Sequence, residues 1–383
     1  MNLLSRIKKI AVSLEKKNNA LFRVPVSAQK SYLEHFREPS DLIERSFFQY
    51  KCQMRLYGKV NAIIINIVSL PLLIFYYVKK NTKIIDKNTV DAVFISEGIP
   101  FNVVPASLKK QFGKWHIEDG RGDSFTEQDK KYFKMIVKKH PLSWHYLLKS
   151  LLKIRFYSYE ISKFSPQIIT VCGEYSFTSS LLTDYCYNLK ILHVNVMHGE
   201  KLYFIRDSFF SYDKCYVWND YYKKLFIELR ADPNQFCIEV PESLFFTGTD
   251  VSKNINYTYY LGAETGEKLV SILKSLQQIA GYGNKVAIRP HPRYTDINEL
   301  ARIHGLIEIE DFKELTIEES LMRTENAISL YSTVLNQAVH NNVSIVIDDV
   351  TDPAMYKKLV DLKYVILKEQ HSLLSDVVKE QFK

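Results

Sequence analysis

Residues 285–293 read Lys-Val-Ala-Ile-Arg-Pro-His-Pro-Arg, and residues 326–333 read Asn-Ala-Ile-Ser-Leu-Tyr-Ser-Thr. Each stretch begins as a short apolar run, which is typical of a buried parallel strand, and then ends abruptly in polar residues. The polar residues at the two ends are Arg289, His291, Arg293, Ser332 and Thr333. Ligands of α/β sheets bind at the carboxyl ends of the strands, and helix N-termini favour anions. The two stretches therefore predict a site for a phosphate or diphosphate.

The segments around these stretches alternate between strand-like and helix-like patterns. Strand-like runs lie at residues 91–97, 114–118, 167–172, 190–197, 214–218, 257–262 and 343–348. Helix-length segments separate them, among them residues 130–163, with a break at Pro141, and the amphipathic run 264–280. Because strands that alternate with helices form parallel sheets, the sequence predicts an α/β fold with two Rossmann-like domains facing a central cleft.

Three parts are expected along the chain. Residues 1–85 form a basic, partly apolar helical region that associates with a membrane or packs on the first domain. Residues 86–245 form an N-terminal Rossmann-like domain, and residues 255–383 form a C-terminal one. The boundary falls within residues 241–254, where Ser, Thr, Gly and Asp cluster and the hydrophobic periodicity lapses.

Length and cysteine content limit the class of protein. A chain of 383 residues with 46% hydrophobic residues is long enough for two domains with separate cores. The five cysteines are an odd number and contain no Cys-x-x-Cys spacing, so neither a disulfide framework nor a zinc site is indicated. This pattern is typical of a reducing, cytosolic compartment.

Positive charge is concentrated near the N-terminus. Residues 1–80 hold 14 Lys and Arg against 5 Asp and Glu, a net charge of +9 (14 minus 5), whereas the whole chain has a net charge of +8. The remaining residues therefore sum to −1 (8 minus 9). A nucleic-acid-binding protein more often carries its basic excess on the folded domain, so the distribution favours an anionic membrane surface as the partner and no nucleic acid.

Two N-terminal segments fit such a partner. Residues 3–14 place apolar side chains on one helical face with basic residues around them, as in an interfacial helix or a helix docked on the domain. Residues 60–78 form a 19-residue apolar run, long enough to span a bilayer, but Asn61, Asn66 and Pro71 interrupt it and lysines flank both ends. A membrane-dipping or buried helix is favoured over a spanning one. We expect a cytoplasmic protein peripherally attached to the inner face of a bacterial membrane.

The His-Pro element followed by a Ser/Thr pair resembles the nucleotide-binding half of bacterial sialyltransferases and related capsule glycosyltransferases of the two-Rossmann (GT-B) type. The resemblance implies that His291, Ser332 and Thr333 hold the phosphate of a CMP-sugar. It also implies that the acidic triplet at residues 118–120, Glu-Asp-Gly, supplies the general base, with Asp119 as the base and Glu118 beside it. The first domain would then bind the acceptor and the second the nucleotide-sugar.

The chemistry of this reaction fits the residue types. Transfer from a nucleotide-sugar needs a base for the acceptor hydroxyl and donors that stabilise the departing phosphate. Arg289, His291 and Arg293 supply positive charge, and Arg forms bidentate contacts with phosphate, so neither a metal nor a cofactor is expected. Simpler explanations remain for each element. The prolines terminate a strand, Ser332 and Thr333 cap a helix, and the acidic triplet forms a turn.

Residues 197–201, Met-His-Gly-Glu-Lys, close another apolar strand. The His-Gly pair resembles the catalytic element of teichoic-acid glycerol- and ribitol-phosphate transferases, which share the GT-B fold and use CDP-alcohols. This resemblance implies His198 as an alternative base, and histidine suits that role because its pKa lies near neutrality. Acidic residues at strand ends are candidates for the acceptor cleft: Glu97, Glu174 and Glu200.

The sequence as a whole favours an inverting, metal-independent glycosyltransferase that transfers an acidic sugar such as sialic acid from a CMP-sugar to a bacterial surface glycan. The partners would be the nucleotide-sugar donor and a glycan or lipid-linked glycan acceptor. Polyol-phosphate transfer from a CDP-alcohol is the first alternative. A non-catalytic scaffold and a UDP-sugar epimerase of the same fold are the others.

Overall fold

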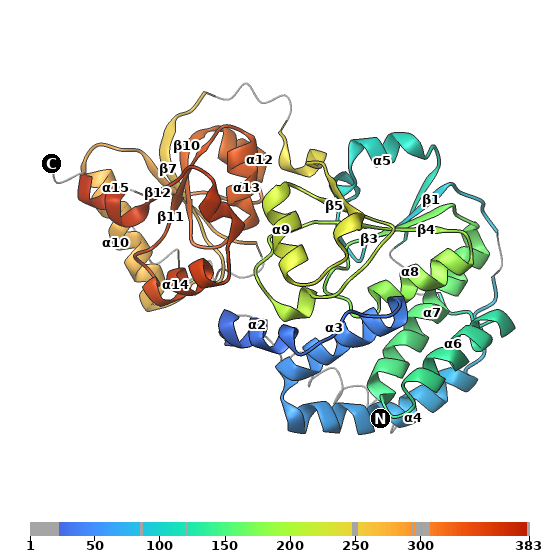
Figure 1. The fold of residues 1–383 in the computed structure, drawn as a ribbon. Coiled ribbons are helices and arrows are strands. Elements are labelled where there is room, and N and C mark those ends of the chain that lie inside the picture. The colour runs from blue at the N-terminus through green and yellow to red at the C-terminus, as the bar shows by residue number, and fades with distance from the viewer. Residues whose placement is uncertain are drawn as a thin grey trace, which may run out of the picture. The chain divides into compact units, whose positions relative to one another are not determined.

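The computed structural model describes residues 23–84, 87–118, 122–246, 252–292, 295, 300 and 307–380. The chain divides into two compact units, one of Met1–His198 with Tyr203–Pro241 and one of Gly199–Leu202 with Glu242–Lys383. Each unit has a six-stranded, fully parallel sheet with helices packed around it (Figure 1). The predicted fold class, α/β with two Rossmann-like units, is confirmed.

The first sheet has the strand order β2-β1-β3-β4-β5-β6. Its strands are β1 (Ala92–Ile95), β2 (Trp115–Glu118), β3 (Ile168–Val171), β4 (Leu192–Val196), β5 (Lys214–Val217) and β6 (Phe236–Ile238). Its helices are α2 (Val26–Glu34), α3 (Leu42–Tyr57), α4 (Lys59–Val78), α5 (Ala106–Gln111), α6 (Glu127–Lys139), α7 (Trp144–Phe164), α8 (Ser179–Asn188) and α9 (Asp220–Glu228).

The apolar strands are buried because helices cover both faces of this sheet. All four residues of β1 are buried, and they alternate between two cores. Val93 and Ile95 pack with residues of α3, α6, α7 and α8, whereas Ala92 and Phe94 pack on the other face with residues of α5. Because successive side chains of a strand point to opposite faces, a continuous apolar run is what a strand covered on both sides requires.

The second sheet has the strand order β12-β11-β10-β7-β8-β9. Its strands are β7 (Ile255–Tyr260), β8 (Val286–Arg289), β9 (Ile307–Ile309), β10 (Thr324–Ser329), β11 (Ser344–Ile347) and β12 (Ser372–Leu373). Its helices are α10 (Glu267–Gly281), α12 (Ile317–Met322), α13 (Thr333–His340), α14 (Pro353–Asp361) and α15 (Leu374–Glu380).

Both strand orders contain one reversal, which locates the ligand-binding edge. Numbered within its own unit, the second sheet has the order 3-2-1-4-5-6 of dinucleotide-binding Rossmann domains, read from β9. The first sheet begins 2-1-3-4-5, the other common doubly wound order. The reversals lie between β1 and β3 and between β7 and β10. In open α/β sheets, ligands bind at the carboxyl ends of the strands at such a reversal.

The N-terminal helices belong to the first unit. Helix α3 packs against α8, and α4 packs along α7. By length and composition α4 is the one helix among the described residues that could cross a membrane. Its Asn66 side chain accepts a hydrogen bond from the His145 N–H (3.0 Å) and donates one to the Leu142 carbonyl (2.9 Å), which fixes α4 to the start of α7. The predicted interfacial helix at residues 3–14 lies outside the described residues.

Candidate functional site

The first unit has a cavity at the carboxyl edge of its sheet, where the strand order reverses between β1 and β3. Its volume is about 270 Å³. The walls come from the segments that follow β1 and β3 and from helices α3 and α7. Polar side chains that line it include Gln53, Glu97, His145, Lys149, Lys153 and Tyr157. The cavity therefore combines a binding position typical of the fold with charged groups of both signs.

Helix α7 supplies one wall of this cavity. His145, Lys149 and Lys153 follow one another at four-residue spacing, so they lie on one face of the helix. The Lys153 Nζ lies 3.1 Å from Glu97 Oε1. Glu97 has a left-handed backbone (φ 48°) and is followed by Gly98 (φ 85°), so the chain turns sharply after β1. This turn brings Glu97, a predicted acceptor-cleft residue, into the cavity wall.

His193 lies beneath the cavity as a neutral, buried histidine. Its Nε2 is 2.9 Å from the Tyr157 hydroxyl, and its Nδ1 is 2.8 Å from Thr183 Oγ1. Burial, and next the charge of Lys153, lower the pKa of His193 to about 3. The imidazole is therefore uncharged at neutral pH and fixes the position of Tyr157 in the cavity wall.

Glu174, a second predicted acceptor-cleft residue, follows β3 but is fully buried. Its carbonyl accepts a hydrogen bond from Gln49 Nε2 at 2.8 Å. The Tyr212 hydroxyl has a pKa raised well above its usual range, chiefly by burial and next by the negative charge of Glu174. Glu174 is therefore an internal carboxyl near the cavity, whereas its neighbours Gly173 and Tyr175 form part of the wall.

The predicted general base is described only in part. Glu118 is the last residue of β2, and its Oε2 lies 3.2 Å from the His116 Nε2. The His116 ring stacks on Phe164 with ring centroids 4.1 Å apart, which directs both side chains toward α7. Asp119 lies outside the described residues, so its role stays a prediction.

Sequence reasoning did not single out Glu160, which pairs with Glu118. Glu160 is the single acid in the sequence of α7, and its side chain is fully buried. Burial, and next the neighbouring Glu118 carboxyl, raise the pKa of Glu160 to about 8. Glu160 is thus mostly protonated at neutral pH, close to the Glu118 carboxyl. It lies seven residues after Lys153, on the helical face that lines the cavity. A lone acid in a buried helical segment was the available sequence signal.

In the second unit, Ser332 and Thr333 lie at the reversal of strand order, at the carboxyl end of β10. Ser332 is the N-cap of α13, and its Oγ accepts a hydrogen bond from the Val334 N–H at 3.2 Å. Thr333 is the first helical residue, and no acid occupies the first turn of the helix. Backbone N–H groups at such a helix start, together with the helix dipole, favour a phosphate.

Helix α10 begins on the other side of the same reversal, after β7. Its N-cap, Gly266, has a left-handed backbone (φ 57°), which glycine adopts without strain. One carboxylate, that of Glu267, lies in the first turn of this helix, and Glu264 accepts a hydrogen bond from the Gly262 N–H (2.6 Å) in the turn before it. Of the two helix starts, that of α13 therefore suits an anion better. Sequence reasoning missed this turn, for which residues 262–266, Gly-Ala-Glu-Thr-Gly, were the signal.

His291 follows β8 at the same edge of the sheet. Its backbone N–H donates to Thr295 Oγ1 at 2.8 Å, and that hydroxyl donates to the Gly262 carbonyl at 3.2 Å. The segment that carries His291 is thereby tied to the end of β7, the strand between β8 and β10. Strands in a sheet lie about 5 Å apart, so the ends of β8 and β10 are separated by about 10 Å. Arg293 lies outside the described residues.

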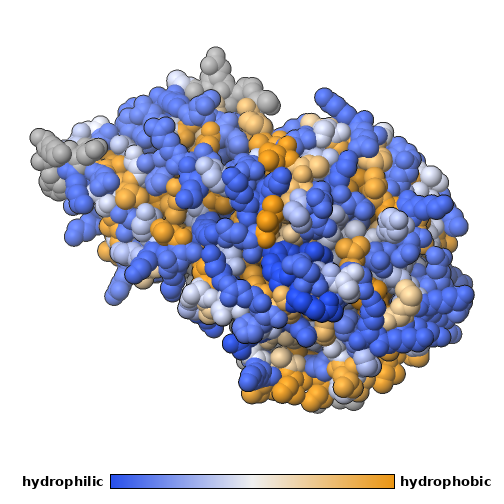
Figure 2. Space-filling model, viewed as in Figure 1, coloured by the Kyte–Doolittle hydropathy of each residue, from blue (hydrophilic) through white to orange (hydrophobic). Residues whose placement is uncertain are grey.

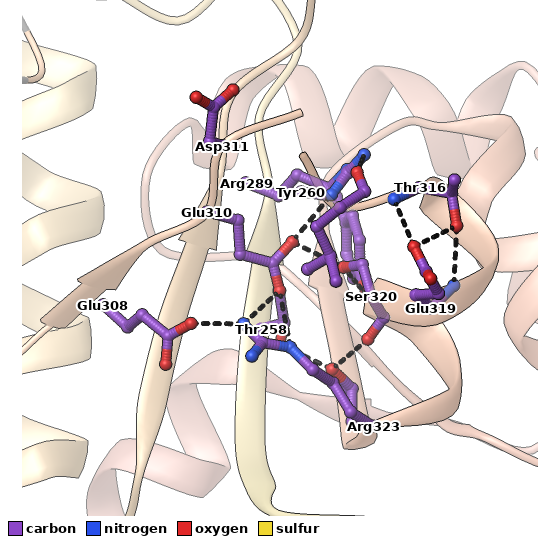
Figure 3. Close-up of polar contacts among 12 residues, drawn as sticks. Thr258, Tyr260, Arg289, Glu308, Glu310, Asp311, Thr316, Glu319, Ser320 and Arg323 are labelled. Atoms are coloured by element: carbon purple, nitrogen blue, oxygen red, sulfur yellow. Dashed lines mark hydrogen bonds and ion pairs between the residues drawn. The ribbon is translucent and has the colours of Figure 1, made fainter. Parts of the chain in front are cut away.

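Arg289, predicted to bind phosphate, is part of a buried ion network (Figure 3). Its Nη1 donates to Glu310 Oε2 at 3.0 Å, and its Nη2 donates to the Leu315 carbonyl at 2.7 Å. Glu310 also accepts hydrogen bonds from Ser320 (2.6 Å) and Arg323 (2.9 Å). The positive charge of Arg289 is therefore balanced inside the protein, and in this structure the side chain fixes the end of β8 against the segment after β9.

The His-Gly element follows β4 in the first unit. His198 is half-buried at the carboxyl edge of that sheet, two residues after the strand ends. The Trp218 Nε1 donates to the Met197 carbonyl at 3.2 Å, which holds the preceding residue. Glu200 is half-buried and lies in the short segment, Gly199–Leu202, that groups with the second unit. His198 as a base and Glu200 as a cleft residue both stay predictions.

Within the described part of the chain, no cluster of three or more His, Cys, Asp and Glu side chains could hold a metal ion. The five cysteines are free thiols, and four of them are buried. The polar groups described above lie in three sets: one around the cavity of the first unit, one in the buried network of Arg289, and one at the helix start of α13.

Comparisons with known proteins find structural similarity at low sequence identity. No protein-family model matches the chain, and no curated protein sequence matches it. A candidate UDP-N-acetylglucosamine 2-epimerase from Listeria monocytogenes is similar with a TM-score of 0.45 and 10% identity, over 78% of this chain and 91% of that one. The wall teichoic acid polymerase TagF gives 0.41 and 11%, over 88% of each chain. The glycosyltransferase SnogD from Streptomyces nogalater gives 0.41 and 9%, over 77% of this chain and 99% of that one. At these scores the fold assignment rests on strand order.

Proposed function

We propose that this protein is an inverting glycosyltransferase that transfers an acidic sugar from a CMP-sugar to a bacterial surface glycan, without a metal ion. The observation that carries the proposal is the position of Ser332 and Thr333. They start an acid-free helix at the strand-order reversal of a sheet with the dinucleotide-binding order. The resemblance of the His-Pro and Ser/Thr elements to sialyltransferases supports CMP as the nucleotide.

The donor phosphate would lie at the start of α13. The Ser332 and Thr333 hydroxyls and the first N–H groups of the helix would donate hydrogen bonds to its oxygens, and His291 would approach from the end of β8. These groups balance the charge that develops on CMP as it leaves, which is the role that a metal ion fills in other transferases. Arg289 would position the end of β8 through Glu310 instead of contacting the phosphate.

The acceptor would occupy the cavity of the first unit. Its lining of Glu97, Lys149, Lys153 and Tyr157 offers donors and acceptors that suit the hydroxyls and carboxylates of a glycan. The general base would come from the acidic segment after β2, with Asp119 as the base. Glu160 would keep the neighbouring Glu118 carboxylate hydrogen-bonded and in place.

The reaction would proceed by one displacement. The base takes the proton of the acceptor hydroxyl, and the acceptor oxygen forms a bond to the anomeric carbon from the face opposite CMP. The bond between that carbon and the phosphate oxygen breaks, and its electron pair leaves with CMP. The configuration at the anomeric carbon inverts, and no other reactant is needed.

A second candidate is polyol-phosphate transfer from a CDP-alcohol, with His198 as the base. The observation that favours it is the half-buried position of His198 at the carboxyl edge of the first sheet, two residues after β4 ends. In this reaction the acceptor oxygen attacks phosphorus, so the bond that breaks is phosphorus to oxygen, and CMP again leaves.

The experiment that tests the proposal incubates the purified protein with CMP-sialic acid or CDP-glycerol and a panel of glycan acceptors, and analyses the products by mass spectrometry. The proposal predicts a product that gains a sugar and no phosphorus. A product that gains a phosphorus atom establishes the second candidate instead. A parallel incubation with a UDP-sugar and no acceptor tests for an epimerase, and the absence of a product with every donor favours a scaffold.

A further inference from the structure

Helix α4 has two apolar faces, and only one of them is covered by the protein. One face packs along α7, where Ile65, Ser69 and Leu72 are buried. The opposite face runs the length of the helix and consists of seven exposed apolar residues: Val60, Ile63, Ile64, Ile67, Ile74, Phe75 and Val78. We call this set the α4 outer face. Positions three and four apart lie on one side of a helix, so the set forms a continuous stripe.

The α4 outer face is large for a protein that is in contact with water alone. Val60 and Val78, at its two ends, are each 70% exposed. Figure 2 shows hydrophobic residues gathered along the edge of the molecule where Figure 1 draws α4. Single exposed apolar residues are normal, but a contiguous apolar stripe marks a surface that another phase or molecule covers.

The covered face of α4 limits how the helix meets that partner. Asn66 bonds to the backbone of residues 142 and 145, and Ser69 Oγ donates to the Ile65 carbonyl at 2.7 Å. To span a bilayer, α4 would have to separate from α7, along which it packs and whose sequence carries several charged residues. The helix therefore exposes the α4 outer face along its whole length, as a helix that lies in the plane of a membrane interface does.

The charges around α4 indicate what covers the outer face. Lys59 begins the helix, and exposed Lys79 and Lys80 follow its end. Lys79 shares its charge with Asp123. In a two-fold dimer, α4 of a second copy would pack antiparallel to α4 of the first. Lys59 of each copy would then lie near Lys79 and Lys80 of the other. That juxtaposition is repulsive, whereas an anionic lipid surface attracts both ends and the wider +9 charge of residues 1–80.

We propose that the α4 outer face docks the protein on an anionic phospholipid surface, with α4 lying in the plane of the interface. The apolar stripe enters the boundary between headgroups and acyl chains, and the lysines at the two helix ends contact lipid phosphates. The cavity of the first unit lies close by along the chain, because its wall residue Tyr57 precedes α4 by a single glycine. If the proposed transfer is correct, docking brings the acceptor site to the membrane; the docking itself does not depend on that activity.

The test is co-sedimentation of the full chain with phosphatidylcholine vesicles that contain or lack phosphatidylglycerol. The variant Ile63→Glu/Ile67→Glu places two charges on the α4 outer face at positions that are 60% and 57% exposed, so the fold should persist. The matched control, Val270→Glu/Val360→Glu, adds the same charge at apolar positions that are 63% and 49% exposed on α10 and α14. Thermal unfolding in the absence of lipid verifies that both variants are folded.

We expect the parent chain and the control to bind vesicles that contain phosphatidylglycerol, and the α4 variant to bind them at least about tenfold more weakly. Three results would overturn the proposal. The first is that the parent chain fails to sediment with either type of vesicle, and the second is that both variants lose binding equally. In the third, light scattering shows a parent dimer that the α4 variant converts to a monomer, without any vesicle binding.

Discussion

Arg289 and Glu310 form a buried ion pair, with Nη1 and Oε2 3.0 Å apart, at the carboxyl ends of the neighbouring strands β8 and β9. The Arg289 side chain is 8% exposed and the Glu310 side chain is fully buried. Sequence pattern alone marks Arg289 as a phosphate ligand, whereas the structure commits its guanidinium to a carboxylate and a backbone carbonyl. The strand end that carries His291 therefore depends on this pair.

We expect Arg289→Met to lower the free energy of unfolding by on the order of 3 kcal/mol, because it leaves the Glu310 carboxylate buried with less compensation. The double variant Arg289→Met/Glu310→Gln should recover part of this loss, since the uncompensated charge is removed as well. Urea denaturation of both variants and of Glu310→Gln gives the coupling energy between the two residues. A variant of Arg289 that unfolds like the parent but no longer binds nucleotide would show that the arginine is a phosphate ligand instead.

Ser332 separates helix capping from phosphate binding. Asp is as good an N-cap as Ser, so Ser332→Asp should leave the free energy of unfolding within about 0.5 kcal/mol of the parent value. Its carboxylate would, however, repel a phosphate at the start of α13, and we expect nucleotide affinity to fall at least about tenfold. Ser332→Asn is the matched neutral control, because it also caps the helix but adds no charge. Isothermal titration with CMP measures the affinities, and equal affinity in the two variants would exclude a phosphate at this helix start.

The Glu160 carboxyl makes the stability of the first unit depend on pH. Its pKa is raised from 4.5 to about 8 by burial and by Glu118, so between these values the folded state holds a proton that the unfolded state has lost. Stability therefore falls as pH rises from about 4.5 to 8, by about 1.4 kcal/mol for each unit of pKa difference. We expect Glu160→Gln to raise the melting temperature at pH 8 by several degrees and to have little effect at pH 4.5. If the substitution changed the melting temperature equally at the two pH values, the pKa of Glu160 would not be raised in the folded protein.

His193 gives the opposite dependence at acidic pH. Because burial lowers its pKa from 6.5 to about 3, the unfolded state binds a proton in this range that the folded state excludes. The contribution of neutral His193 to stability is therefore fully present above pH 6.5, and it is lost progressively as pH falls toward 3. His140, with its pKa lowered to about 4 chiefly by burial, contributes in the same direction. Denaturation midpoints between pH 7 and 4 should show a weaker decline in His193→Gln than in the parent, and an unchanged slope would contradict this account.

The central strands of both sheets were predictable because their burial on two faces leaves continuous apolar runs in the sequence. Those runs identify β1, β3, β4, β5, β7, β8, β10 and β11, and their boundaries agree to within about two residues. The strands without a sequence prediction are β6, β9 and β12, which are edge strands of two or three residues. A strand this short, paired on one side, needs no apolar run, so it leaves no periodic signal.

The site was predictable to a smaller extent. Strand ends and a hydroxyl pair before a helix located the start of α13, because topology alone brings such residues to one edge. The pairing of Arg289 with Glu310 and of Glu118 with Glu160 joins residues that are 21 and 42 positions apart, and packing decides both. Local sequence also gave no reason to expect that one face of α4 is covered by α7 while the other is exposed.

The most direct test of the central claim is the thermal stability of the parent chain and of Ser332→Asp with CMP, CDP, UDP and GDP. A ligand that binds the folded state alone adds about 2.7 kcal/mol at a concentration one hundred times its Kd. We predict that CMP and CDP raise the melting temperature of the parent, that UDP and GDP do not, and that Ser332→Asp loses the response. Stabilisation by UDP or GDP and not by CMP, or an undiminished response to CMP in Ser332→Asp, would contradict a cytidine nucleotide bound at the start of α13.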